Sequence, residues 1–96
     1  MEQPLYTSTK VNNEIELCEI TEPECKRFIE KALLRERISY YVRWPKPTLF
    51  HRNKNTCIIC INDNFKELAE SLVRAVCDEK GYHVRFIMKR SQNQYL

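Results

Sequence analysis

The stretch Thr56–Ile61 reads Thr-Cys-Ile-Ile-Cys-Ile, and it is β-branched, apolar or sulfur-containing at every position. Asn55 precedes it and Asn62-Asp63 follows it, so polar residues bound a segment of strand length. The segment does not alternate between apolar and polar residues, which predicts a strand that hides both faces from water. One domain of 96 residues rarely covers both faces of a sheet. The run therefore suggests a partner surface, such as a second copy of the chain.

Composition indicates one ordinary globular domain. The chain is 43% hydrophobic and 30% charged, and domains commonly hold about 100–150 residues. No apolar run approaches the roughly 18–20 residues of a membrane span, and no signal-peptide pattern follows Met1. We therefore expect a cytoplasmic protein without a membrane segment. The five cysteines form an odd set scattered through core-like elements, which predicts reduced and mostly buried thiols.

Hydrophobic periodicity and turn residues predict six elements between residues 14 and 89. The predicted strands cover 14–20, 38–44, 56–61 and 82–89, and the predicted helices cover 21–35 and 63–80. Gly81, the only glycine, marks the end of the second helix. The order strand, helix, strand, strand, helix, strand is typical of an α+β, ferredoxin-like βαββαβ sandwich, in which two helices cover one face of a four-stranded antiparallel sheet. We expect a flexible segment at 1–13, the domain at 14–89 and a tail at 90–96.

In this fold the first and third strands are central, so the Thr56–Ile61 strand has one face beneath the helices and one face open. We expect the core to receive Ile38, Tyr40, Val42, Trp44, Val84, Phe86 and Met88, the more apolar sets of the edge strands. In the central strand 14–20, alternation places Ile15 and Leu17 on one face and Cys18 and Ile20 on the other. Isoleucine and cysteine of the central strands should then form an apolar stripe on the open face.

An exposed stripe of this size usually serves as a contact surface. The candidate interface residues are Tyr41, Ile58, Cys60, Arg85 and Ile87. The predicted occupant is a second copy, giving a homodimer, or another protein. The tail 90–96 folding back and an ordinary solvated sheet remain as alternatives.

A second hypothesis concerns positive charge. Residues 35–54 hold six basic side chains and one acidic side chain, whereas residues 1–34 hold four basic and seven acidic ones. Such asymmetry can mark an anionic partner, and nucleic acid is the alternative function. The segment can equally be a solvated loop balanced by the acidic first strand. The candidate anion-binding residues are Arg43, Lys46, His51, Arg52, Lys54 and Lys89.

Catalytic and metal-binding patterns are weak. Cys57 and Cys60 have the spacing of a zinc or redox pair, but residues three apart in a strand point to opposite faces. Cys25 lies in the first turns of a helix, yet it belongs to the apolar stripe and is expected in the core. Glu14 and Glu16 share a strand face, which a solvated edge explains. We therefore predict no catalytic residue, metal or cofactor, and a non-enzymatic interaction or regulatory module.

Overall fold

The computed structural model describes residues 13–45 and 56–90, and the statements below concern those residues. Residues 1–12, 46–55 and 91–96 lie outside them; these ranges include nearly all of the predicted N-terminal segment 1–13 and of the predicted tail 90–96. The elements follow in the order β1 (Glu14–Ile20), α1 (Pro23–Arg35), β2 (Tyr40–Arg43), β3 (Cys57–Asn62), the 3-10 turn η1 (Asp63–Phe65), α2 (Lys66–Lys80) and β4 (Arg85–Arg90).

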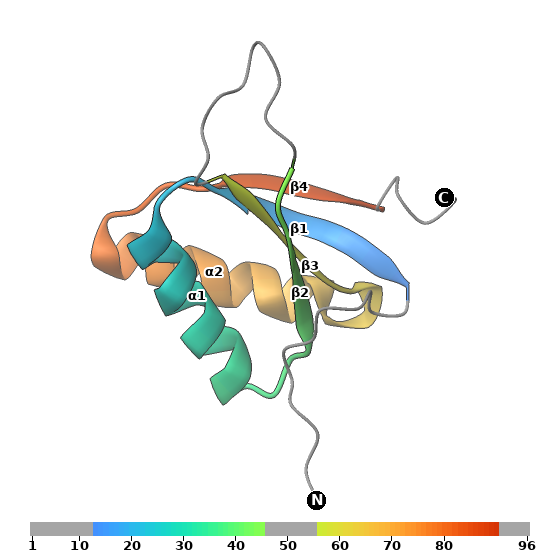
Figure 1. Cartoon of the computed structure of the whole chain (residues 1–96). Helices are drawn as coiled ribbons and strands as arrows, with labels where there is room; N and C mark the ends of the chain where they lie inside the picture. Colours follow the sequence, from blue (N-terminus) through green and yellow to red (C-terminus); the bar gives the residue numbers. More distant parts are fainter. Residues whose placement is uncertain (1–12, 46–55, 91–96) are drawn as a thin grey trace, which may run out of the picture.

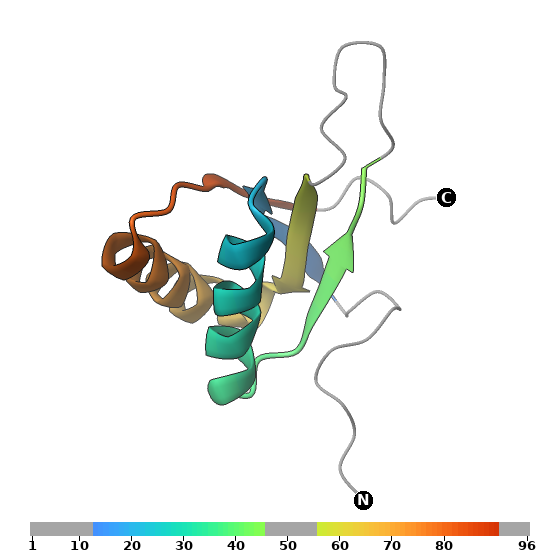
Figure 2. The ribbon, with the colours of Figure 1, turned by 60° about the vertical axis from the view of Figure 1, so that its left-hand side comes forward.

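The four strands form one antiparallel sheet in the order β2-β3-β1-β4. Both helices lie on the same side of this sheet, and no helix of residues 13–45 and 56–90 covers the other side (Figures 1 and 2). The predicted ferredoxin-like arrangement is therefore confirmed, including the central position of β1 and β3. The edge strands are shorter than predicted: β2 begins at Tyr40 rather than Ile38, and β4 begins at Arg85 rather than Tyr82.

A β-bulge in β1 sets the direction of its side chains. Glu16 pairs with Cys60, but the next paired residues are Cys18 and Ile59, so Leu17 is an extra residue opposite β3. A bulge places two consecutive side chains opposite one residue of the partner strand. Leu17 and Cys18 consequently both belong to the buried core cluster, together with Ile15 and Ile20. The predicted division of these four residues between two faces is wrong, because simple alternation omits the bulge.

The bulge region also involves the edge strand β4. The partners of Glu16 and Cys18 in β4 are Lys89 and Phe86, which leaves Ile87 and Met88 opposite the single residue Leu17. Met88 has φ of 59°, a conformation that is uncommon for residues other than glycine. The edge of β4 is therefore irregular at its centre.

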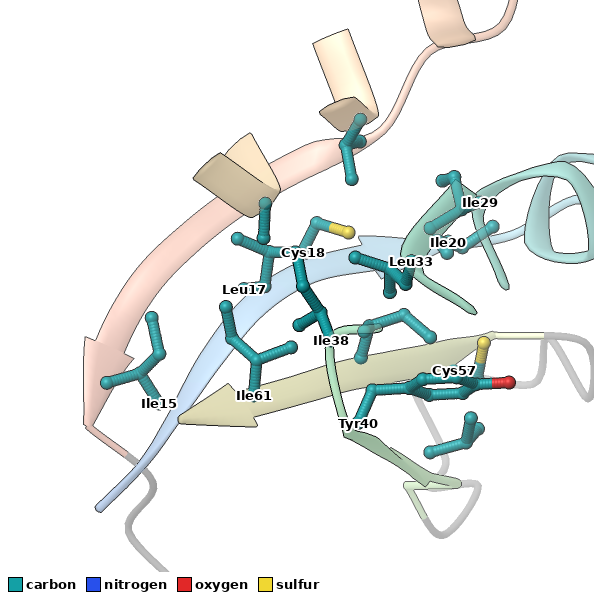
Figure 3. Packing of buried hydrophobic residues seen from close by; sticks show 14 of the residues in the cluster. Ile15, Leu17, Cys18, Ile20, Ile29, Leu33, Ile38, Tyr40, Cys57 and Ile61 are labelled. Carbon is teal, nitrogen blue, oxygen red and sulfur yellow. The ribbon is translucent and has the colours of Figure 1, made fainter. Parts of the chain in front are cut away.

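The core lies between the sheet and the two helices. Leu17, Cys18 and Ile20 of β1 point toward the same layer as Ile29 and Leu33 of α1 (Figure 3). β3 contributes Cys57, Ile59 and Ile61, all fully buried in this layer. Burying a Leu or Ile side chain of this kind contributes about 1.5–3 kcal/mol. The two central strands thus supply most of the apolar surface that holds the helices.

Three aromatic or aliphatic side chains that were predicted in the core are exposed instead. Trp44 is 53% exposed because β2 ends at Arg43 and Trp44 lies beyond the paired strand, next to Pro45. Phe65 and Leu68 fall at helical spacing with Leu72 and Val76 in the predicted helix 63–80, which predicts them on its apolar stripe, yet they are 42% and 46% exposed. The α-helix starts later than predicted, after the 3-10 turn, and its fully buried residues are Ala69 and Val73.

The predicted end of α2 at Gly81 is confirmed. Gly81 has φ of 79°, and the backbone N–H groups of Gly81 and Tyr82 both donate to the carbonyl of Cys77. These two bonds make the left-handed helix cap that glycine favours. A Cβ atom added at Gly81 would meet nothing within 4 Å, so the cost of a substitution comes from the backbone alone.

We expect Gly81→Ala to lower the free energy of unfolding by about 1–2 kcal/mol, because an L-residue is strained in the left-handed conformation. Urea denaturation measures this change. Gly81→Asn is the matched control and should cost less, since asparagine tolerates this conformation better than alanine. Equal losses for the two variants would contradict the explanation.

The cysteines are free thiols in the reduced state, as predicted, and four of them are fully buried. Burial is the largest cause that raises the pKa of Cys57 to about 11 and the pKa values of Cys25 and Cys60 to about 12, from an ordinary 9.0. Burial raises the pKa of Cys18 as well. In the folded protein these thiols stay protonated at a pH where the unfolded chain already ionises.

These thiols should therefore not change the free energy of unfolding below pH 9. The free energy of unfolding should fall as the pH rises from about 9 toward 11. Each buried thiol contributes a slope of about 1.4 kcal/mol per pH unit in that window. Urea unfolding between pH 8 and pH 11, with reductant present, measures the slope. Cys57→Ala should make it shallower, whereas Val42→Ala, a core truncation without a thiol, should leave it unchanged.

Candidate interaction surface on the open face of the sheet

Strand register identifies the side chains of the open face, because directly paired residues of antiparallel strands share a face. Cys57 pairs with Ile20 of the core, whereas Cys60 pairs with Glu16 and Tyr41 on the opposite side. The prediction that the two thiols point to opposite faces is confirmed. The paired residues of the open face are Tyr41 and Arg43 of β2, Ile58, Cys60 and Asn62 of β3, Glu14, Glu16 and Glu19 of β1, and Arg85 and Lys89 of β4.

This face is not the apolar stripe that alternation predicts. The bulge turns the apolar residues of β1 toward the helices, so β1 presents glutamates instead. The apolar residues that β3 presents, Ile58 and Cys60, are 8% and 0% exposed, so the chain itself already covers them. The open face differs from the predicted one because β1 has one extra residue at Leu17.

Charge is arranged in columns across the open face. Glu16 accepts a hydrogen bond from the Arg43 guanidinium, which reaches it from β2 across β3. Glu19 accepts a bond of 2.7 Å from Arg85 of β4, and Lys89 lies directly opposite Glu16 in the same strand pair. The face therefore has an acidic column on β1 and basic residues on both edge strands.

Glu14 has an unusual environment on this face. Its side chain is only 3% exposed, and neither carboxylate oxygen has a hydrogen-bond partner. The nearby Cys60 thiol is only a weak donor; after burial, Glu14 is the strongest cause that raises the pKa of that thiol. The Nε atom of Arg43 is also buried without a partner. Buried polar atoms without partners are rare and call for an explanation.

The candidate interface residues fall into three groups. Tyr41 and Ile87 are partly buried, Ile58 and Cys60 are buried, and Arg85 is exposed. Arg43 and Lys89 of the candidate anion-binding set share the open face, whereas Lys46, His51, Arg52 and Lys54 lie outside the described residues. Sequence reasoning undervalued Glu14, Glu16 and Glu19. The three glutamates are separated by two residues and then by three, and the longer interval spans the extra residue of the bulge.

A second feature lies on the helix side, between the end of α2 and β4. A hollow of about 340 Å³ is lined by Arg74, Cys77, Asp78, Gly81, Tyr82, His83, Val84 and Phe86. Arg74 covers the ring of Phe86, with its guanidinium carbon 4.4 Å from the ring centroid. The Tyr82 hydroxyl donates a hydrogen bond of 2.9 Å to Glu24 of α1. Cys77 is only partly buried, so its thiol is the most accessible of the five.

Metal binding and membrane insertion find no support in the described ranges. Within 13–45 and 56–90, no three His, Cys, Asp or Glu side chains are placed to hold a metal ion. No helix of the same ranges is long and apolar enough to span a membrane. Comparisons with protein-family models, with curated proteins and with solved structures found no match.

We expect Glu14→Gln to raise the free energy of unfolding by about 1–3 kcal/mol at pH 7, because it removes a charge that is buried without a partner. Urea denaturation of the monomeric protein at low concentration measures the change. Glu19→Gln is the control, since Glu19 has its partner Arg85 and should show no gain. A loss of stability in Glu14→Gln would show that the carboxylate is satisfied in solution.

Proposed function

We propose that this chain is a non-enzymatic interaction module that associates through the open face of its sheet, with a second copy of itself as the partner. The observation that carries the proposal is the arrangement of charge on the open face, where the exposed Lys89 of β4 lies opposite Glu16 of the acidic strand β1.

Charge complementarity favours a second copy as the partner. On the same face, β1 presents Glu14, Glu16 and Glu19, and the neighbouring β4 presents Arg85 and Lys89. A two-fold axis parallel to the strands and between β1 and β4 stacks the acidic column of each copy on the basic column of the other. Such an interface is self-complementary, as two-fold symmetry requires.

The positions of the charged residues along the strand axis fit this arrangement. Rotation about an axis parallel to the strands preserves the position along the strand, and Lys89 is level with Glu16. Lys89 of the partner subunit would therefore approach Glu16. Ile87, partly buried and between Arg85 and Lys89 in sequence, would add apolar contact near the axis.

Sedimentation velocity over a range of concentrations tests the proposal. We expect a monomer–dimer equilibrium that weakens as salt rises, because the contacts are between opposite charges. Lys89→Glu should weaken association by about tenfold or more, or 1.4 kcal/mol. Combining it with Glu16→Lys should restore part of the lost affinity, since Glu16 is level with Lys89 and the swap returns opposite charges to the same contact.

Lys31→Glu is the matched control, because it makes the same charge change at an exposed position of α1. It should leave the dimer unchanged. A folded protein that stays monomeric at its highest soluble concentration would overturn the proposal. Equal weakening by Lys31→Glu and Lys89→Glu would show that net charge, rather than this face, controls association.

Nucleic-acid binding stays a prediction. Four of the six candidate anion-binding residues lie outside the described residues, and Arg43, a described member on the open face, is engaged by Glu16. No contact in the described part of the chain favours this alternative over the interaction module.

A further inference from the structure

The hollow between the end of α2 and the start of β4 carries an unbalanced negative charge. Its volume is about 340 Å³, at the small end of the range of about 300–1,000 Å³ for ligand pockets. With histidine counted as neutral, two charged side chains line it, Arg74 and Asp78. The charge of Arg74 is compensated, because its Nε and one terminal nitrogen donate to Glu70 at 3.1 and 2.8 Å.

Asp78 is the charged group of the lining that has no partner. Its carboxylate makes no ion pair or hydrogen bond within residues 13–45 and 56–90. Asp78 also lies in the last turn of α2, where a negative charge is unfavourable because the negative end of the helix dipole is there. The last carbonyl groups of a helix, which lack partners within it, add to this negative end. Helix stability therefore does not explain an acidic residue at this position, and the hollow favours a positively charged ligand.

The walls of the hollow suit an apolar group. Tyr82, Val84 and Phe86 are partly buried and line it beside Cys77. The faces of aromatic rings attract cations, and this part of the molecule already contains such a contact. The guanidinium carbon of Arg74 lies 4.4 Å from the centroid of the Phe86 ring. A ligand that joins a positive charge to an apolar group therefore matches both the charge and the walls of the hollow.

A bare metal ion matches the hollow less well. Cys77, Asp78 and His83 all belong to its lining. Across the described ranges, however, no three His, Cys, Asp or Glu side chains are placed to hold a metal ion. The apolar walls would also gain no contact from such an ion. An organic cation is therefore the better match.

We propose that this hollow binds a small organic amine in which a single aromatic ring is linked to a primary ammonium group. The ammonium pairs with the carboxylate of Asp78, and the ring packs against Tyr82, Val84 and Phe86. The small volume of the hollow limits the ligand to about one ring. The site lies on the helix side of the sheet, so it is independent of the proposed dimer face.

The test uses phenethylamine as the probe and the backbone amide of Gly81 as the reporter. Gly81 is the only glycine of the chain and lines the hollow, so selective ¹⁵N labelling of glycine gives one backbone NMR signal, from the site itself. In a titration of the whole folded chain, we expect this signal to shift saturably with a dissociation constant of about 1 mM, a value in keeping with a ligand of this size.

Two matched ligands separate the contributions of charge and ring. Phenylacetate has the same ring with a negative charge, and it should bind at least about fivefold more weakly than phenethylamine because it loses the ion pair with Asp78. Butylamine has the ammonium without the ring, and it should also bind more weakly because it loses the contacts with the aromatic walls.

Two variants test the role of Asp78. Asp78→Asn should weaken the binding of phenethylamine about fivefold, the upper range for an ion pair that solvent can reach. Glu79→Gln is the matched control, because Glu79 is the next acidic residue, is exposed and is not among the residues that line the hollow. It should bind phenethylamine as the wild type does. Both positions are exposed on α2, so we expect both variants to fold, and circular dichroism verifies this.

Three results would overturn the proposal. The first is the absence of a saturable shift of the Gly81 signal at phenethylamine concentrations well above the expected dissociation constant. The second is equal binding of phenethylamine and either matched ligand. The third is the same affinity for phenethylamine in folded Asp78→Asn as in the wild type.

Discussion

One extra residue in β1 determines which chemistry each side of the sheet presents. Without the bulge at Leu17, strict alternation would send Cys18 and Ile20 to the open face and Glu19 to the core. With it, four apolar side chains of β1 face the helices and three glutamates face the other way. Both the packing of the helices and the charge columns of the open face depend on this single irregularity. It is a local feature of the backbone with consequences for both layers of the molecule.

Much of the fold follows from pattern and turn chemistry. Gly81 ends α2 where a left-handed residue is needed, and the order of six elements leads to the observed sheet. The composition of the open face could not be predicted in the same way. Period-two reasoning assumes one residue opposite one residue, and the position of a bulge depends on how the neighbouring strands pair. The change in spacing from Glu14–Glu16 to Glu16–Glu19 becomes informative only when that pairing is known.

The predicted ends of β2 and α2 are wrong for a different reason. Trp44 continues the apolar alternation of β2, but the sheet provides no neighbour beyond Arg43, and a side chain without a covering layer remains exposed. Phe65 fits the helical period of α2, yet the chain makes a 3-10 turn before the α-helix begins. In both cases the local sequence favours the predicted element, but the contacts with the rest of the fold end that element earlier or start it later.

The irregular edge at Met88 limits how this sheet can grow. An exposed edge strand is a template for another strand when its backbone groups are evenly spaced. β4 breaks that spacing at Met88, whose φ is 59°, and β2, the other edge, has only four residues before Trp44 and Pro45. Within the described residues, neither edge strand offers a long regular ladder to an incoming chain. These edges therefore disfavour open-ended, strand-by-strand polymerisation.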